Sequence, residues 1–387
     1  MEIYLVGGAV RDKLLGLPVT ERDWVVVGAT PDTLLELGYK PVGKDFPVFL
    51  HPQTKEEYAL ARTERKTGPG YTGFETCAGP DITLEDDLLR RDLTINAMAE
   101  TPAGELVDPY GGREDLEQRL LRHVSPAFAE DPVRILRIAR FAARFANRGF
   151  HVAHTTNTLM RTMVSNGEVE HLVPERVWAE LVKALATETP EKFFHVLAAC
   201  GALLTLFPEF APLQQDHTAD AHGHIAIRLP VLEQATRLSN NTAVRFAALV
   251  CDLDQATASG FHSDALEALC ERHRVPNASR ELAGMALQQH QPAQAADTLG
   301  AAQLLALLNS LDAFRRPERF AQFLLVCKAV TRAKQREFDG TFLQQALAAA
   351  RSVSATELAQ QGLSGKEIGA ALQQKRIAAI EESLLQS

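Results

Sequence analysis

The sequence predicts a fold in two parts: an α+β head over residues 1–125, followed by an all-α remainder. Short β-rich runs and helical patterns alternate in the first part. From about Pro126 onward strand signals nearly vanish, and alanine, leucine, glutamine and arginine recur with helical spacing. With 387 residues, 46% of them hydrophobic and 23% charged, the chain is large and apolar enough for two or three globular domains.

The head's elements follow from local pattern. Its β-rich runs are EIYLV at residues 2–6, WVVV at 24–27, VFLHP at 48–52 and EEYALARTE at 56–64. Its helical runs are RDKLLGL at 11–17 and TPDTLLELGY at 30–39, the second with Thr30 or Asp32 as a cap. The stretch TGPGYTGFE at residues 67–75 has little to bury and is expected to be a mobile loop. In the helical part, breaks are expected at residues 208–224 and 352–354.

Composition bears on the compartment. No apolar run approaches the ~20 residues that a membrane-spanning helix needs. The start, MEIYLVGG, lacks the basic region and long apolar core of a secretion signal. The cysteines are odd in number and scattered, which favours reduced thiols in a cytoplasm: Cys77, Cys200, Cys251, Cys270 and Cys327. We therefore expect a cytoplasmic protein that makes no membrane contact.

Charge is distributed unevenly along the chain. The net charge of −9 argues mildly against a nucleic-acid partner. Between Arg119 and Arg148, however, there are seven arginines against two acids, Glu130 and Asp131. Because of this local excess of positive charge, a nucleic-acid partner remains an alternative.

A Gly-Gly pair follows the first strand. Gly7 and Gly8 have no Cβ, so a phosphate can approach the backbone closely there. The free N–H groups at the start of the next helix favour an anion, and Arg11, one turn further on, is suited to fork onto phosphate oxygens. A tight strand-to-helix connection without a ligand is the alternative.

Two carboxylates precede the second strand. In an extended chain Glu21 and Asp23 project from the same face, where they repel each other unless a cation lies between them. Such a pair suits two Mg²⁺ ions roughly 3.5–4 Å apart, as in phosphoryl transfer. A solvated charged turn is the alternative, but the neighbouring glycine pair favours metal binding.

These residues carry a family resemblance. GGAVRD at residues 7–12, then LLG, then a carboxylate-x-Asp pair resembles the nucleotidyltransferases of the polymerase-β superfamily, in particular the bacterial class II CCA-adding enzymes. Four further blocks follow in the family's order: RRDLTINAMA at 90–99, DPYGGREDL at 108–116, EDPVRILRIARF at 130–141 and PERVWAEL at 174–181. The second half of the chain matches only weakly.

The resemblance implies an organisation and an activity. The implied parts are a nucleotidyltransferase head at 1–125, a neck with a base-reading helix at 126–170, a helical body at 171–225, an HD-like region at 226–330 and a tail at 331–387. The implied reaction is template-independent addition of C, C and A to the 3′ end of tRNA, with CTP and ATP as substrates and Mg²⁺ as cofactor. No protein partner is implied.

The active site departs from the family at one position. The family places aspartate at both metal positions, whereas this chain has Glu21 at the first. The extra methylene moves the carboxylate by roughly a bond length, and a misplacement of about 1 Å can cost on the order of 100-fold in rate. We expect Glu21 to be a tolerated ligand, with a spectator or a mark of weakened catalysis as the alternatives. Glu57 is a candidate third carboxylate, with a surface glutamate as the alternative.

By resemblance, the protein itself selects the incoming base. Asp131 is suited to accept from the exocyclic amines of C and A, while Arg134 donates to the neighbouring ring acceptors. The two are three residues apart, so one helical face would present both. A mismatched base would leave a buried polar group unpaired, at a cost of about 1–3 kcal/mol. Further along, Arg137 and Arg140 are expected to contact the triphosphate or base, and Arg144 and Arg148 tRNA phosphates.

The RRD block completes the expected pocket. Arg91 would reach the nucleotide, Asp92 would orient an arginine or the ribose, and Arg90 is expected to be structural. Asn96 is a candidate for the sugar or for a helix cap. Two further expectations are a hinge at Asp108-Pro109 and Gly111-Gly112, and substrate contacts from the residues flanking the glycine-rich loop, Arg65 and Lys66.

Some long relatives carry an HD phosphohydrolase domain with a metal-binding motif like HDLGK. The corresponding segment here is RFAALVCDLDQA at residues 245–256, with Cys251 at the histidine position and Asp254-Gln255 at the Gly-Lys position. We expect the helices to remain as scaffold and tRNA-binding surface, and the metal-dependent phosphatase activity to be lost.

Two other functions remain open. A bacterial poly(A) polymerase shares the carboxylate pair and the RRD block, although the first 180 residues look more like the CCA-adding group. A catalytically weakened tRNA-binding protein, disabled by Glu21, is the second alternative.

Overall fold

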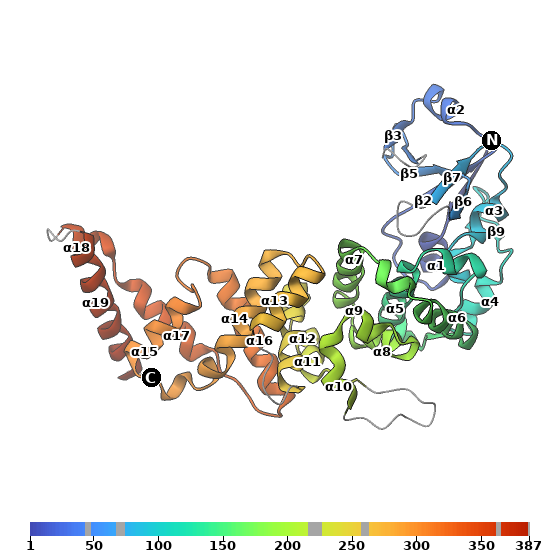
Figure 1. Cartoon of the computed structure of the whole chain (residues 1–387). Coiled ribbons are helices and arrows are strands. Elements are labelled where there is room, and N and C mark those ends of the chain that lie inside the picture. The colour runs from blue at the N-terminus through green and yellow to red at the C-terminus, as the bar shows by residue number, and fades with distance from the viewer. Residues whose placement is uncertain (43–47, 67–73, 216–226, 257–262, 361–364, 386–387) are drawn as a thin grey trace. The chain divides into compact units, whose positions relative to one another are not determined.

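The computed structural model describes residues 1–387 except 43–47, 67–73, 216–226, 257–262, 361–364 and 386–387. The chain divides into two compact units, one of described residues up to Pro208 and one from Glu209 onward (Figure 1). The five finer segments expected from the resemblance stay a prediction. No helix in the described ranges is long and apolar enough to cross a membrane.

The first unit contains a seven-stranded mixed sheet in the order β3-β4-β5-β2-β1-β8-β9. Its strands are β1 (Glu2–Val6), β2 (Asp23–Val27), β3 (Lys40–Val42), β4 (Val48–Leu50), β5 (Glu57–Leu60), β8 (Ala99–Glu100) and β9 (Leu106–Val107). Strands β2 and β5 run parallel, and the other neighbours run antiparallel. A separate hairpin joins β6 (Arg62–Lys66) to β7 (Phe74–Ala78). The run EEYALARTE therefore forms two strands, β5 and β6, instead of one.

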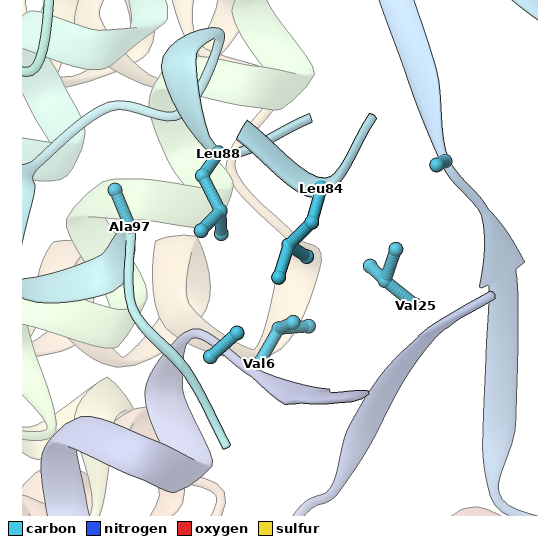
Figure 2. Packing of buried hydrophobic residues seen from close by; sticks show 7 residues of the cluster. Val6, Val25, Leu84, Leu88 and Ala97 are labelled. Carbon is cyan, nitrogen blue, oxygen red and sulfur yellow. The ribbon is translucent and has the colours of Figure 1, made fainter. Parts of the chain in front are cut away.

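Consecutive residues of a strand point to opposite sides of a sheet, and an apolar cluster covers each side of this one. On one face Val6 and Val25 pack under Leu84 and Leu88 of α3 (Leu84–Leu89), as Figure 2 shows. On the other face Val26 belongs to a second apolar cluster, together with Leu34 of α2 (Pro31–Glu36), Tyr39, Phe49, Tyr58 and Leu60. Thr30 caps α2 through the backbone N–H of Thr33, as expected.

Helices complete the first unit. The α-helices are α1 (Gly8–Leu14), α4 (Gly112–Glu117), α5 (Val133–Phe145), α6 (His154–Ser165), α7 (Pro174–Leu185), α8 (Glu191–Cys200) and α9 (Ala202–Leu206). Short 3₁₀ turns include η1 (Thr94–Asn96), η2 (Pro126–Glu130) and η3 (Ala146–Arg148). A two-residue parallel pair, β10 (Leu120–Leu121) with β11 (His151–Val152), is an exception to the helical character expected after Pro126.

The start of α4 is tightly fixed. The side chain of Asp108 accepts the backbone N–H groups of Gly112 and Arg113, each at 2.8 Å. A Cβ at Gly112 would overlap the carbonyl oxygen of Thr94. The expected turn is present at residues 109–110 and leads into a capped and close-packed helix start, while a hinge between head and neck stays a prediction.

The second unit is helical throughout its described elements. They are α10 (Ala211–Gln215), α11 (Pro230–Leu238), α12 (Thr242–Ala256), α13 (Ser263–Arg272), α14 (Asn277–Gln294), α15 (Ala301–Ser310), α16 (Pro317–Ala333), α17 (Thr341–Ser352), α18 (Ala355–Gln360) and α19 (Gly365–Leu385). Helices α11, α12, α14 and α16 pack on one another. The break expected at residues 352–354 separates α17 from α18.

Candidate active site

The ends of three neighbouring strands meet at one corner of the sheet. Asp23 is the first residue of β2 and lies opposite Val6, the last residue of β1, which leads directly into Gly7 and Gly8. In the parallel register Asp23 also lies beside Glu57, the first residue of β5. The sheet therefore brings the expected metal ligand, the glycine corner and the candidate third carboxylate together.

Glu21 lies just before β2 and not within it. The intervening Arg22 approaches Glu56 at 3.5 Å, and Trp24 Nε1 donates to Glu56 at 3.0 Å. Residues 22 and 24 therefore share one face, and the alternation of an extended chain puts residues 21 and 23 on the other. The charge of Glu21 raises the pKa of Asp23, so the two carboxylates lie within electrostatic reach of each other.

A cavity of about 580 Å³ opens at this corner. It is lined by Val19, Thr20, Glu21, Arg22, Asp23, Thr54, Lys55, Glu56 and Glu57. Its size lies within the range typical of small-molecule sites, ~300–1,000 Å³. Carboxylates dominate the polar lining, so the cavity suits a cation or a ligand that arrives with one.

Three influences act on Asp23. Partial removal from water raises its pKa, the positive charge of Arg91 lowers it, and the negative charge of Glu21 raises it again, with a net increase. A divalent cation would relieve this repulsion, and carboxylate oxygens are ligands that Mg²⁺ prefers. Glu21 and Asp23 therefore fit the expected metal. Among the described residues no three Asp, Glu, His or Cys side chains gather into a ligand set, so a third ligand from Glu57 stays a prediction.

The glycine corner is closed by Arg91. Gly7 has a φ of +68°, and a Cβ there would lie 2.8 Å from Arg91 Nη1. Arg91 Nη2 donates to Asp87 at 3.1 Å, and the same carboxylate accepts from Arg90 at 2.7 Å. Burial works against the charge of Asp87, but the two arginines still lower its pKa. This anchored guanidinium lies beside the glycine corner, and its contact with a nucleotide stays a prediction, whereas Arg90 has the structural role expected for it.

The guanidinium of Arg11 lies against Gly8, where a Cβ would be 3.4 Å from Nη2, but its donors are engaged inside the protein. Its side chain is 3% exposed, and it donates through Nε to Asp12 at 2.9 Å and through Nη1 to Asn96. Its guanidinium carbon lies 5.1 Å from the centre of the Phe141 ring. Because these donors bond Asp12 and Asn96 within the protein, a fork of Arg11 onto phosphate oxygens gains no support from this geometry and stays a prediction.

The expected base-reading pair does not share a helical face. Helix α5 begins at Val133, so Asp131 precedes it, in extended backbone. Asp131 accepts from both Nη atoms of Arg176, at 3.2 and 2.8 Å. Arg134 donates to the carbonyl oxygens of Ala127 and Arg90, at 3.0 and 2.7 Å. The argument from one helical face is corrected, while recognition of the base by these residues stays a prediction.

The arginines of α5 are largely paired with acids. Arg137 Nε donates to Asp92 at 2.7 Å, and Arg144 Nη2 donates to Asp12 at 2.8 Å. Arg140 pairs with Glu180 of α7. Arg148, in η3, is exposed. The expectation that Asp92 orients an arginine is confirmed by Arg137, whereas nucleotide contacts of Arg137 and Arg140 stay predictions.

Asn96 has a different role from the two expected for it. Its side chain is 6% exposed, accepts from Arg11 and donates to Asp92 at 3.0 Å. It is also the last residue of η1 and caps no helix. The expectation of a cap is therefore wrong, while a sugar contact stays a prediction that these engaged side-chain atoms do not support. Arg65 and Lys66 belong to β6, but their side chains and residues 67–73 of the glycine-rich loop lie outside the described residues.

Sequence reasoning missed the acids that neutralise these arginines. No role was assigned to four paired residues, although three of them lie inside the quoted blocks. They are Asp12, Asp87, Glu180 and Arg176, the last of which is the arginine partner of Asp131. The sequence did indicate that acidic partners exist, because arginines at helical spacing on an otherwise apolar helix must be paired if they are buried. Which acid meets which arginine was not readable from spacing.

The segment at residues 245–256 forms α12 and holds α11 at both ends. Asp252 accepts the backbone N–H groups of Val231 and Leu232, each at 2.9 Å, at the start of α11. Arg245 Nε donates to the carbonyl oxygen of Ser239, at the end of α11. Asp252 thus accepts two N–H groups that have no partner within the helix, and the positive charge of Arg245 complements the C-terminal end of the helix dipole.

The hydrogen bonds that clamp α11 engage Asp252, the carboxylate that the expected HD motif would use as a metal ligand. Asp252 is 3% exposed with both oxygens engaged, and Cys251 is fully buried with its thiol pKa raised by burial. The residues present do not fit a catalytic metal, which needs accessible, uncommitted ligands. Loss of the phosphohydrolase activity stays a prediction, now with a structural reason.

Removing the clamp should destabilise the second unit. We expect Asp252→Ala to lower the free energy of unfolding by about 2 kcal/mol, because two buried N–H donors lose their acceptor. Urea unfolding followed by circular dichroism measures this change. Asp297→Asn, on an exposed acid of the same unit, is the matched control and should change it by less than about 0.5 kcal/mol. An equal effect of both variants would contradict the clamp.

The same residue predicts a pH dependence. Burial raises the pKa of Asp252 to about 8, against the two backbone N–H donors that lower it. Because the pKa is higher in the folded than in the unfolded chain, folding takes up a proton, and the stabilisation is lost as pH rises. The stability of the unmodified protein relative to Asp252→Asn should therefore fall between about pH 4 and pH 8.

A carboxylate pair at a strand end, a glycine corner and an anchored arginine on a mixed sheet define a nucleotidyltransferase head of the polymerase-β class. The family described as "Poly A polymerase head domain" matches residues 3–122, and "Probable RNA and SrmB-binding site of polymerase A" matches residues 149–214. The chain is 54% identical to the "Multifunctional CCA protein" of Thioalkalivibrio sulfidiphilus, covering 99% of this chain and 98% of the relative. It is 53% identical to the protein of the same name from Nitrosococcus oceani, covering 99% of each.

The chain belongs to the family of bacterial class II CCA-adding enzymes, as its identity to these two relatives shows. Solved structures agree on the fold. The Bacillus stearothermophilus CCA-adding enzyme in complex with CTP has a TM-score of 0.67 at 22% identity, covering 98% of this chain and 89% of that one. The Thermotoga maritima CCA-adding enzyme complexed with tRNA has a TM-score of 0.66 at 23% identity, covering 100% and 91%.

Proposed function

We propose that this protein adds C, C and A to the 3′ end of tRNA without a template, using CTP and ATP and releasing pyrophosphate. The observation that carries the proposal is the register that places Asp23 beside both the glycine corner and Glu57, in a chain more than half identical to named CCA proteins. The proposed site of action is the cytoplasm, where tRNA is matured.

The residues divide the chemistry among them. Glu21 and Asp23 would hold Mg²⁺, which when bound activates the 3′-hydroxyl of tRNA and balances charge on the departing pyrophosphate. Gly7 lets the guanidinium of Arg91 approach the backbone closely, and Arg91, fixed by Asp87, would supply positive charge to the triphosphate there. The attack on the α-phosphate is then a direct in-line displacement, and the arginine and the carboxylates keep the reacting groups in line.

Base selection is assigned to the start of α5. Asp131 is held by Arg176 and retains lone pairs that can accept from the amines of C and A. Arg137 uses only Nε in its bond to Asp92, which leaves its Nη groups for a base or phosphate. Uracil and guanine would set a carbonyl against Asp131 and lose a hydrogen bond, at a cost of about 1–3 kcal/mol.

A single assay tests the function against its alternatives. A tRNA transcript ending at its discriminator base is incubated with the protein, Mg²⁺, CTP and ATP, and the products are resolved at single-nucleotide resolution. Addition of three nucleotides and no more supports CCA addition. An open-ended adenosine ladder would identify a poly(A) polymerase, and absence of product a tRNA-binding protein.

Glu21 is the most informative position for this assay. We expect Glu21→Gln to lower kcat/KM for CTP addition on the order of 100-fold, because a charged ligand is lost, whereas Glu21→Asp should stay within about tenfold. Single-turnover incorporation with labelled CTP measures both. An inactive unmodified protein that gains activity through Glu21→Asp would show that Glu21 disables the site.

A further inference from the structure

Six side chains form a hydrogen-bonded chain that starts and ends on α5. In order, this α5 ring consists of Arg144, Asp12, Arg11, Asn96, Asp92 and Arg137. Its two ends, Arg137 and Arg144, are seven residues apart and so lie two turns apart on one face of the helix. The rings of Phe141 and Phe145, from the same face, lie 5.1 and 5.2 Å from the guanidinium carbon of Arg11.

The ring alternates in charge and is buried at its middle. Arg11, Asp12, Asn96 and Asp92 are each at most 7% exposed. Every link joins a donor to an acceptor, with Arg144 donating to Asp12 at 2.8 Å and Arg137 donating to Asp92 at 2.7 Å. Asn96 connects the two halves, because its oxygen accepts from Arg11 and its nitrogen donates to Asp92.

Stability alone does not account for such an arrangement. Buried ion pairs cost so much desolvation that apolar residues of similar volume are often equally stabilising. Directional hydrogen bonds instead fix one relative placement of the elements that they join. The elements joined here are α1, which starts at the glycine corner, η1, which follows Arg91, and α5, which begins beside Asp131.

We infer that Asn96, Asp12 and Arg144 are positioning residues: through the α5 ring they hold the triphosphate corner at a fixed distance from the helix assigned to base selection. This inference rests on the proposed function and extends it. It also assigns Arg144 to nucleotide geometry, where the sequence had suggested contact with tRNA phosphates.

Arg144 provides the sharpest test, because its partly exposed side chain can be changed without opening the core. We expect Arg144→Gln to raise the KM for CTP and for ATP about tenfold, with the KM for tRNA and its salt dependence unchanged, and Arg144→Lys to restore most of the loss. Arg148→Gln, at the next arginine along the chain and outside the ring, should affect only the KM for tRNA. A salt-dependent rise in the KM for tRNA with Arg144→Gln, at constant KM for CTP, would overturn the inference.

Asn96 tests the middle of the ring. Asn96→Leu should lower kcat/KM for CTP on the order of 100-fold, as expected for a displacement of about 1 Å. Asp115→Asn is the matched control, since Asp115 is also buried and paired, with Arg122, but lies outside the ring. It should lower the unfolding midpoint without changing kcat/KM for CTP. Unchanged kcat/KM in folded Asn96→Leu would contradict the inference.

Failure of the proposed function would give a different result. If the unmodified protein adds no nucleotides to tRNA, CTP binding measured by calorimetry replaces the kinetic readout. Weaker CTP binding by Arg144→Gln would then still support the ring, and equal binding by both proteins would refute it.

Discussion

Asp23→Asn is expected to abolish nucleotide addition, with kcat/KM for CTP falling on the order of 1,000-fold or more. Asp23 is the first residue of β2. It lies opposite Val6, the last residue before the glycine corner, and beside Glu57, the first residue of β5. Asparagine keeps the shape of the side chain and removes the negative charge, so a metal ligand and its electrostatic stabilisation of the reaction are lost together. Single-turnover CTP addition measures the loss.

The same substitution should not cost stability. Desolvation and the charge of Glu21 raise the pKa of Asp23, which means that the fold disfavours its ionised form at neutral pH. Neutral asparagine removes this penalty, so the unfolding midpoint should stay equal or rise. Asp32→Asn, at the first turn of α2, is the charge-matched control and should leave both activity and midpoint unchanged. A lower midpoint for Asp23→Asn would show that the carboxylate serves the fold instead.

Gly7→Ala is expected to lower kcat/KM for CTP on the order of 100-fold. Gly7 has a φ of +68°, and an added Cβ would lie 2.8 Å from Arg91 Nη1, so the guanidinium or the corner must move. The strained backbone, with a ψ of −124°, should also cost about 1–3 kcal/mol of stability. Steady-state kinetics and thermal unfolding measure the two effects.

Gly38→Ala separates strain from contact. Gly38 has a φ of +83°, but nothing lies within 4 Å of the position of its Cβ. This control should therefore lose stability while keeping the kcat/KM of the unmodified protein. If both alanine variants retain activity, the close approach of Arg91 to the corner has no part in catalysis.

Much of the head was predictable because its signals are local. Strands β1 and β2, the glycine turn between β1 and α1, and the cap of α2 by Thr30 follow from runs of fewer than ten residues. Glu21 and Asp23 were likewise found by their spacing. Alternation along a strand and the special conformations of glycine act between neighbours in the chain, so the sequence records them directly.

The base-selecting region shows where this reading failed. Spacing placed Asp131 and Arg134 on one helix, but Pro132 stands at the N-cap and α5 starts only at Val133. Arg134 then finds its acceptors in the carbonyl groups of Ala127 and of Arg90, which is 44 residues away. A helical pattern reveals its period more reliably than its first residue.

Local pattern alone established the two-part architecture, the glycine corner and the acid pair of this nucleotidyltransferase. Tertiary structure alone decided which charges face the cavity and which are buried in the α5 ring. Arg11 meets Asn96 across 85 residues and Arg144 meets Asp12 across 132, and no periodicity spans such distances. A charge is paired or free according to which distant segment packs against it, and that is settled only when the whole unit folds.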